Sequence, residues 1–119
     1  MIDFRTLQVW EKAHQVTLAV YQATKPFPNE ELYGLVSQMR RSSASIPTNI
    51  AEGCGRDSDA ELVRFCQIAM GSASELEYQL ILARDLGLLD QPLYDCLSAD
   101  LVSVKKMLNA FIQKVCQRL

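Results

Sequence analysis

Apolar residues recur three and four positions apart along every long segment of the chain, and no segment alternates strictly between apolar and polar residues. The first spacing places apolar side chains on one face of a helix, whereas strict alternation is typical of a half-buried strand. The pattern therefore predicts an all-α protein. We expect four helices, over about residues 6–25, 29–54, 58–86 and 90–116.

Residues that favour helix ends lie at each expected boundary. Pro26 and Pro28 stop the first helix, and Asn29 is a favourable N-cap for the second. Ser58 followed by Glu61 forms a capping box, in which each side chain satisfies the other residue's backbone N–H. The remaining signals are Asp90 as the N-cap of the fourth helix, and Gly55 and Gly87 as left-handed residues that end the second and third.

The connections between the expected helices are only a few residues long, which makes successive helices antiparallel neighbours. We therefore expect residues 1–119 to form one domain, an antiparallel up-and-down four-helix bundle. In the last helix the apolar residues are spaced alternately by four and three, the rhythm of left-handed bundle packing. They are Leu97, Leu101, Val104, Leu108, Phe111 and Val115.

The segment RRSSASIPTNIAEGCGR, residues 40–56, places a proline inside the second expected helix. Because Pro47 has no backbone N–H, the carbonyl group of Ser43 loses its usual helical partner, and we expect a kink at Pro47. The hydroxyl groups of Ser43 and Ser45 can supply local hydrogen bonds at the bend. A phosphate-binding loop is disfavoured, because the glycines of this segment follow a helix instead of preceding one.

The first expected helix carries two apolar stripes side by side, and only one of them is needed for the core of the bundle. Either this wide arc sinks deeper into its own bundle, or the second stripe packs on another subunit, where aromatic residues are typical. We prefer the second interpretation. The predicted oligomer interface consists of Trp10, His14, Thr17 and Tyr21.

Polar residues occupy core positions where the second and third helices are expected to meet. Counting outward from the turn between these helices places Arg40 about one helical turn from Glu75, so we expect a buried Arg40–Glu75 ion pair among hydroxyl and amide groups. Such a network more often fixes the register of two helices than binds a ligand. Its predicted members are Arg40, Ser43, Asn49, Ser72 and Glu75.

Composition and candidate chemistry narrow the functional classes. The chain has a net charge of −2, no apolar run that could span a bilayer and no export signal in its first residues. We therefore expect a cytoplasmic protein that does not enter the membrane.

The single histidine, His14, cannot supply the two nitrogen ligands of a di-iron site, and the four cysteines form no CxxC pair. No nucleophile has an identifiable base with an orienting partner. We therefore expect no metal, no cofactor and no enzymatic activity.

Two segments, SASIPTNIAEGCGR (residues 43–56) and IAMGSASELE (residues 68–77), and the opening FRTLQVWEKA resemble one family. It comprises the four-helix-bundle proteins encoded in intervening sequences of bacterial 23S ribosomal RNA genes, and it includes the accessory variability protein of diversity-generating retroelements. The resemblance covers essentially the whole chain and implies a ring-like homopentamer with no established enzymatic activity. For the retroelement members it implies binding to nucleic acid and to a reverse transcriptase through a strongly basic surface.

The net charge of this chain departs from that basic pattern, although a ring would repeat even a small basic patch several times. Two functions follow. One is an oligomeric scaffold whose cations contact RNA phosphates, and the other is an oligomeric adaptor for a protein partner, with no nucleic-acid role. The candidate phosphate-binding residues are Arg41, Arg56, Arg64, Lys105, Lys106, Lys114 and Arg118.

Overall fold

The computed structural model describes residues 1–119 and contains four long helices and no strand, which confirms the all-α prediction. Short 3-10 turns precede α1 and follow it, and one π-helical turn leads into α2. The long helices are α1 (Gln8–Thr24), α2 (Ser37–Cys54), α3 (Asp59–Asp85) and α4 (Gln91–Cys116), and the short turns are Phe4–Thr6, Asn29–Glu31 and Leu32–Val36.

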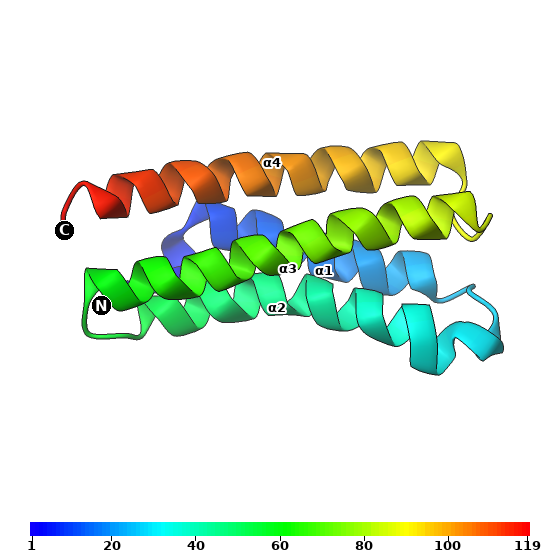
Figure 1. Cartoon of the computed structure of the whole chain (residues 1–119), viewed down its shortest axis with the longest axis horizontal. Coiled ribbons are helices and arrows are strands. Elements are labelled where there is room, and N and C mark those ends of the chain that lie inside the picture. Colours follow the sequence, from blue (N-terminus) through cyan, green and yellow to red (C-terminus); the bar gives the residue numbers. More distant parts are fainter.

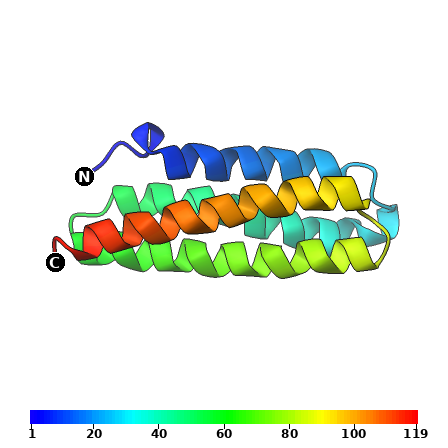
Figure 2. The same ribbon diagram turned by 90° about the horizontal axis from the view of Figure 1, so that it is seen from above.

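Successive helices run in opposite directions and form an up-and-down bundle that measures 46 × 24 × 20 Å (Figure 1). Each helix packs against two others, since α1 and α3 both contact α2 and α4. Both chain ends lie at the same end of the bundle as the α2–α3 turn, whereas the α1–α2 connection and the α3–α4 turn lie at the other end (Figure 2). None of the helices combines the length and the hydropathy needed to span a membrane.

One apolar core runs along the bundle axis because every helix contributes a stripe to it. Val20, Ile46, Leu76 and Leu108 are fully buried representatives of the four helices, and burial of such a side chain contributes about 1.5–3 kcal/mol. The predicted stripe of α4 lies in this core, with Phe111 only partly buried at its edge. The left-handed sense of the packing stays a prediction.

The predicted boundaries of α3 and α4 are confirmed by their capping contacts. The Ser58 hydroxyl accepts a hydrogen bond from the backbone N–H of Glu61 (3.2 Å), and the carboxylate of Asp90 accepts one from the N–H of Leu93 (2.9 Å). The reciprocal half of the predicted capping box is not formed, because the Glu61 carboxylate binds Arg64 instead. Gly87 has a φ of 77°, a left-handed conformation that suits glycine at the end of α3.

The start of the second helical region differs from the prediction. Asn29 begins a 3-10 turn without acting as an N-cap, and α2 starts only at Ser37. The backbone leaves the helical conformation at Gly34 (φ −107°, ψ −108°). This break turns Leu35 and Val36 into the core, while the residues just before Gly34 remain exposed.

The segment around Pro47 also departs from the prediction in one respect. Gly55 has a φ of −86°, so the expected left-handed residue at the end of α2 is wrong. The close approach of α2 to α3 near their turn instead involves Gly53, where an added Cβ would lie 2.9 Å from the Cβ of Phe65. The residues around Pro47 are α-helical from Ser37 to Cys54, and the kink stays a prediction.

Candidate interaction surfaces

The outward face of α1 carries a row of large side chains, Trp10, His14, Leu18 and Tyr21, which we call the α1 stripe. The imidazole of His14 stacks on the Trp10 ring, with 5.2 Å between ring centroids and an interplanar angle of 7°. Leu18 is 54% exposed and Tyr21 41% exposed, whereas Trp10 is only half-buried and packs against the core and the Phe4 ring, so the stripe is absorbed by its own bundle only at its Trp10 end. Three of the four predicted interface residues therefore lie together on one accessible surface.

Thr17 is the exception, because it is buried and faces α2. Its hydroxyl donates a hydrogen bond to the carbonyl oxygen of Ser43 over 2.9 Å. That carbonyl is the acceptor that residue 47 would normally use in a helix, and Pro47 has no N–H to offer. Thr17 therefore links α1 to α2. It does not lie on an outer surface, so its predicted place in the oligomer interface is wrong.

A row of polar side chains does join α2 to α3, as the sequence predicted, but its members differ in part. The hydroxyls of Ser45 and Ser72 lie 2.8 Å apart, and the side-chain amide of Asn49 donates to both the hydroxyl and the carbonyl oxygen of Ser45. The most buried pair is Ser42 with Gln79, at 2.6 Å. No buried side-chain nitrogen or oxygen lacks a partner, so the row is complete without a ligand.

The predicted Arg40–Glu75 pair is wrong. Arg40 donates to the Thr24 hydroxyl (2.9 Å) and the Tyr21 carbonyl (3.3 Å), and its guanidinium lies 4.8 Å from the centre of the Tyr21 ring. Side chains at adjacent positions of a helix point in directions about 100° apart around its axis, so Arg40 faces α1 while Arg41 faces α3. Arg41 is the residue near Glu75, at 4.0 Å between exposed groups. Ser43 likewise bonds within its own helix, since its hydroxyl donates to the carbonyl of Arg40.

Most of the cations expected to contact phosphates already have a carboxylate partner. Arg64 bonds Glu61 at 2.8 Å, and this hydrogen bond lowers the pKa of the Glu61 carboxyl group. Arg56 and Arg64 also lie 4.7 and 4.6 Å from the centre of one buried ring, Phe65. Two of the candidates, Lys106 and Lys114, form no ion pair. The other pairs are Arg41–Glu75 (4.0 Å), Arg56–Glu52 (3.6 Å), Lys105–Glu77 (2.9 Å) and Arg118–Asp59 (3.0 Å).

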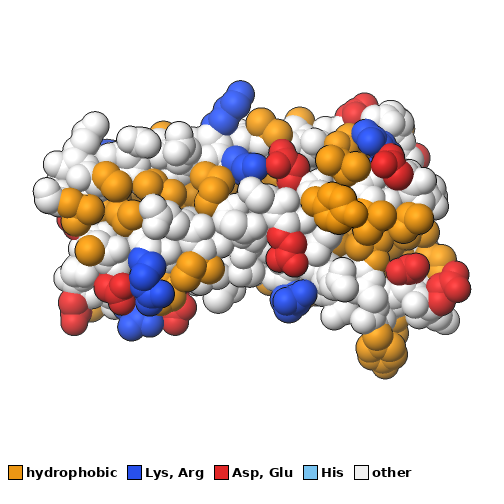
Figure 3. Space-filling view, viewed as in Figure 1, with side chains coloured by type: hydrophobic (Ala, Val, Ile, Leu, Met, Phe, Trp, Pro, Cys, Tyr) orange, Lys and Arg blue, Asp and Glu red, His pale blue; other side chains and the backbone are white.

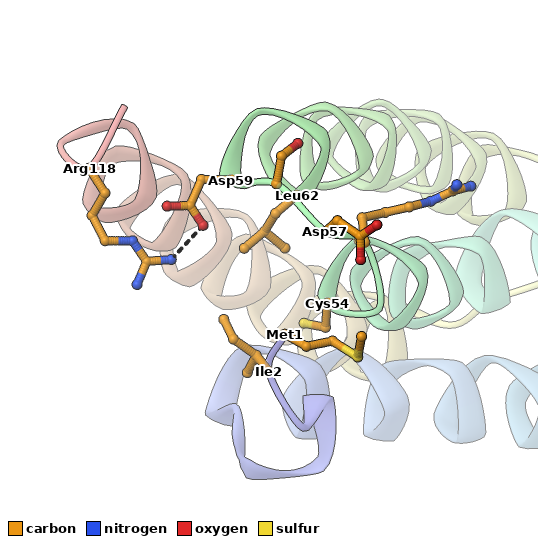
Figure 4. Close-up of a pocket in the computed structure, with 10 residues that line it drawn as sticks. Met1, Ile2, Cys54, Asp57, Asp59, Leu62 and Arg118 are labelled. Carbon is orange, nitrogen blue, oxygen red and sulfur yellow. Dashed lines mark hydrogen bonds and ion pairs between the residues drawn. The ribbon is translucent and has the colours of Figure 1, made fainter.

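A cavity of about 330 Å³ lies at the end of the bundle where the two chain ends meet the α2–α3 turn (Figure 4). The guanidinium of Arg118 and the carboxylate of Asp59 are joined across it at 3.0 Å, and Met1 lies over Cys54. Burial raises the pKa of the Cys54 thiol, which disfavours the thiolate needed for nucleophilic attack. Arg118 and Asp59 thus neutralise each other in this cavity, and the Cys54 thiol that lines it is not activated for nucleophilic attack.

Comparison with known proteins identifies the family. The family model described as 23S rRNA-intervening sequence protein matches residues 5–110. The chain belongs to this family. The crystal structure of a protein with unknown function from the S23 ribosomal protein family, from Bacteroides thetaiotaomicron VPI-5482, has a similar fold, with a TM-score of 0.83 and 25% sequence identity. The similarity covers 94% of this chain and 99% of that protein. No curated protein matches the chain.

Both comparisons agree with the four-helix fold and with the resemblance seen in the segments around Pro47 and Gly71. Neither family description names an enzymatic activity.

Proposed function

We propose that this member of the family is a cytoplasmic, non-enzymatic scaffold that assembles from several copies of the chain. The observation that carries the proposal is the α1 stripe, in which Trp10, His14, Leu18 and Tyr21 are presented on one outward face. Leu18 and Tyr21 are exposed and Trp10 is half-buried beside them, and aromatic and aliphatic side chains grouped on one accessible face are typical of a protein–protein interface. The family resemblance supports five copies arranged as a ring.

Light scattering coupled to size exclusion tests this assembly. The wild-type chain should elute with a mass several times that of one copy, and Leu18→Glu should reduce it towards one copy because a buried, unpaired carboxylate opposes association. Ile68→Glu on α3 is the matched control, since Ile68 is 41% exposed and lies outside the stripe. A wild-type chain that stays monomeric at every concentration measured would contradict the proposal.

A protein is favoured over RNA as the external partner of this scaffold. Five of the seven candidate phosphate-binding cations lie beside carboxylates of the same chain, which lowers the positive potential that a phosphate would meet there. Among the candidate residues, the RNA association implied by the family resemblance would then depend mainly on Lys106 and Lys114; elsewhere in the chain only Lys25 and Arg40 lack an ion pair.

Filter binding with labelled RNA separates the two classes of partner. For a scaffold that binds proteins, we expect no RNA retention even at about 50 mM salt, a low concentration at which contacts between cations and phosphates are strong. Retention that falls steeply with added salt and disappears in a Lys106→Gln/Lys114→Gln double variant would instead support the RNA-binding function.

A further inference from the structure

A hollow of about 450 Å³ opens on the bundle where α1 leads into α2. None of the seven residues that line it is acidic, and two of them carry a guanidinium group. In a chain whose net charge is −2, this lining is a local excess of positive charge. We call this surface the α1–α2 hollow, and it consists of Tyr21, Leu32, Tyr33, Val36, Ser37, Arg40 and Arg41.

Arg40 is held in place at the hollow and still has N–H groups to donate. Its Nε donates to the Thr24 hydroxyl over 2.9 Å, and one Nη donates to the Tyr21 carbonyl oxygen over 3.3 Å. A guanidinium has five N–H groups, so three of them have no partner in the chain once these two are used. Because the side chain is already ordered, an anion that binds there costs little further conformational entropy.

Neither arginine of the hollow is neutralised by a close ion pair. Arg40 forms none, and the guanidinium of Arg41 lies 4.0 Å from the carboxylate of Glu75, with both groups well exposed to water. An exposed pair at this distance contributes little. Both guanidinium groups therefore remain available to an anionic group from outside the chain.

Carboxylates flank the hollow without binding its arginines. Glu30 and Glu31 precede Leu32 in the chain, and a carboxylate oxygen of Glu31 lies 3.6 Å from where a Cβ added at Gly34 would stand. Figure 3 shows an apolar area at this end of the bundle with carboxylates beside it. A long polyanion such as RNA would be repelled by these groups, whereas a single carboxylate can reach the arginines between them.

The remaining part of the hollow suits apolar side chains. The backbone break at Gly34 leaves Leu32 and Tyr33 outside the core, where they are 44% and 92% exposed. Tyrosine and arginine are the residue types enriched in the energetically dominant parts of protein interfaces. An exposed aromatic ring and leucine beside two free guanidinium groups are therefore typical of a surface that binds a protein segment.

We propose that the α1–α2 hollow binds a short segment of a different protein, in which a carboxylate lies beside a large apolar side chain. The carboxylate accepts hydrogen bonds from Arg40 and Arg41, and the apolar side chain packs against Tyr33 and Leu32. This proposal rests on the proposed scaffold function only in taking the external partner to be a protein. It adds where that partner binds and which chemistry recognises it.

Fluorescence anisotropy with labelled synthetic peptides tests the proposal on the full chain. The probe is a short peptide in which glutamate alternates with leucine and phenylalanine. One comparison peptide carries glutamine in place of glutamate, and another carries serine in place of the apolar residues. We expect the probe to bind and each comparison peptide to bind at least about tenfold more weakly, since each lacks one of the two recognised features. Binding of the probe should also weaken as salt is added.

Two variants locate the binding in the hollow. Arg41→Gln removes one guanidinium and Tyr33→Ser removes the exposed ring, and both positions are exposed, so circular dichroism spectra should not change. Each variant should bind the probe about tenfold more weakly than the wild type.

Two matched controls should bind the probe as tightly as the wild type. Arg84→Gln removes a guanidinium that lies 4.4 Å from the centre of the Tyr94 ring, as Arg40 lies over a tyrosine, but that is paired with Asp85 at 3.1 Å. Tyr78→Ser removes another exposed tyrosine, on α3 and outside the hollow.

Several outcomes would overturn the proposal. They are a probe that does not bind, equal binding of the glutamate and glutamine peptides, and unchanged binding in Arg41→Gln and Tyr33→Ser. Displacement of the bound probe by labelled RNA would overturn the choice of a protein segment as the occupant. Light scattering on the same samples separates the two proposals. A chain that assembles without binding the probe contradicts only this one, and a monomeric chain that binds it contradicts only the scaffold.

Discussion

The hydroxyl of Thr17 donates a hydrogen bond to the backbone carbonyl oxygen of Ser43 over 2.9 Å. In an uninterrupted helix the N–H of residue 47 would fill that role, but residue 47 is a proline. A side chain of α1 thus replaces a backbone donor that α2 lacks, and the contact ties the proline-containing segment to the first helix.

Replacing Thr17 with valine should destabilise the fold by about 1–3 kcal/mol, because the buried Ser43 carbonyl loses its donor while the side-chain volume is kept. Urea unfolding followed by circular dichroism measures this loss. Thr17→Ser keeps the hydroxyl and should lose clearly less stability than Thr17→Val. Equal losses in the two variants would mean that the hydrogen bond contributes little.

The Thr17–Ser43 bond should matter less once residue 47 can donate. In a Pro47→Ala background the new N–H can reach the Ser43 carbonyl, so the further loss caused by Thr17→Val should fall to under about 1 kcal/mol. The double-mutant cycle built from four unfolding curves measures this coupling. Strictly additive losses would show that Pro47 and Thr17 act independently.

The Ser42–Gln79 pair predicts a second coupled loss of stability. Ser42→Ala should destabilise the fold by about 1–3 kcal/mol, because the buried amide oxygen of Gln79 loses the hydroxyl that lies 2.6 Å away. Adding Gln79→Leu should recover part of the loss, since both polar partners are then gone. Ser74→Ala, at an exposed position on α3, serves as the control and should change stability by less than about 0.5 kcal/mol.

Two glycine-to-alanine substitutions should have opposite effects on the free energy of unfolding. At Gly53 the new methyl group would lie 2.9 Å from the Cβ of Phe65 and 3.2 Å from Leu62, so helices α2 and α3 must separate, with a loss of about 1–3 kcal/mol. At Gly71 nothing lies within 4 Å, and alanine should stabilise α3 by about 0.5–1 kcal/mol. A stabilising Gly53→Ala would contradict the close approach of the two helices.

The thiol of Cys66 predicts a loss of stability in alkali. Burial raises the pKa of this thiol to about 12, above its ordinary value of 9.0. The folded state therefore retains a proton that the unfolded state releases. The stability of the fold is unaffected by the titration of this thiol below pH 9.0, and the free energy of unfolding decreases as the pH rises from 9.0 towards 12. Unfolding curves between pH 8 and 10.5 should show a shallower decline for Cys66→Ala than for the wild type, although the variant is less stable throughout.

Several features decided by neighbouring residues could be read from the sequence, although the local signals at Asn29 and Gly55 were misleading, and the side-chain contacts between helices could not. The caps at Ser58 and Asp90 depend on backbone groups three positions away and were predicted correctly. Arg40 was placed at the right level but on the wrong side of α2, because one residue changes the direction of a side chain by about 100°. Counting residues from a turn predicts the position of a side chain along the helix axis more reliably than the face of the helix on which it lies.

The same distinction applies to the cations. Arg64–Glu61 and Arg56–Glu52 have the three- and four-residue spacings of helical ion pairs, so the sequence contained a usable sign that these arginines are neutralised. Lys105–Glu77 and Arg118–Asp59 join different helices and needed the fold. Thr17 lies between the core and the α1 stripe in the helical pattern, and its hydroxyl bonds the carbonyl oxygens of Ala13 and Ser43 where it is buried.

The placement of the chain ends and connections makes the bundle directional. One end carries both chain ends and the α2–α3 turn, and the other carries the α1–α2 connection and the α3–α4 turn (Figure 2). An assembly in which the bundles run parallel would therefore have two chemically different rims. Partners fused to residue 1 or to residue 119 would all be displayed from the same rim.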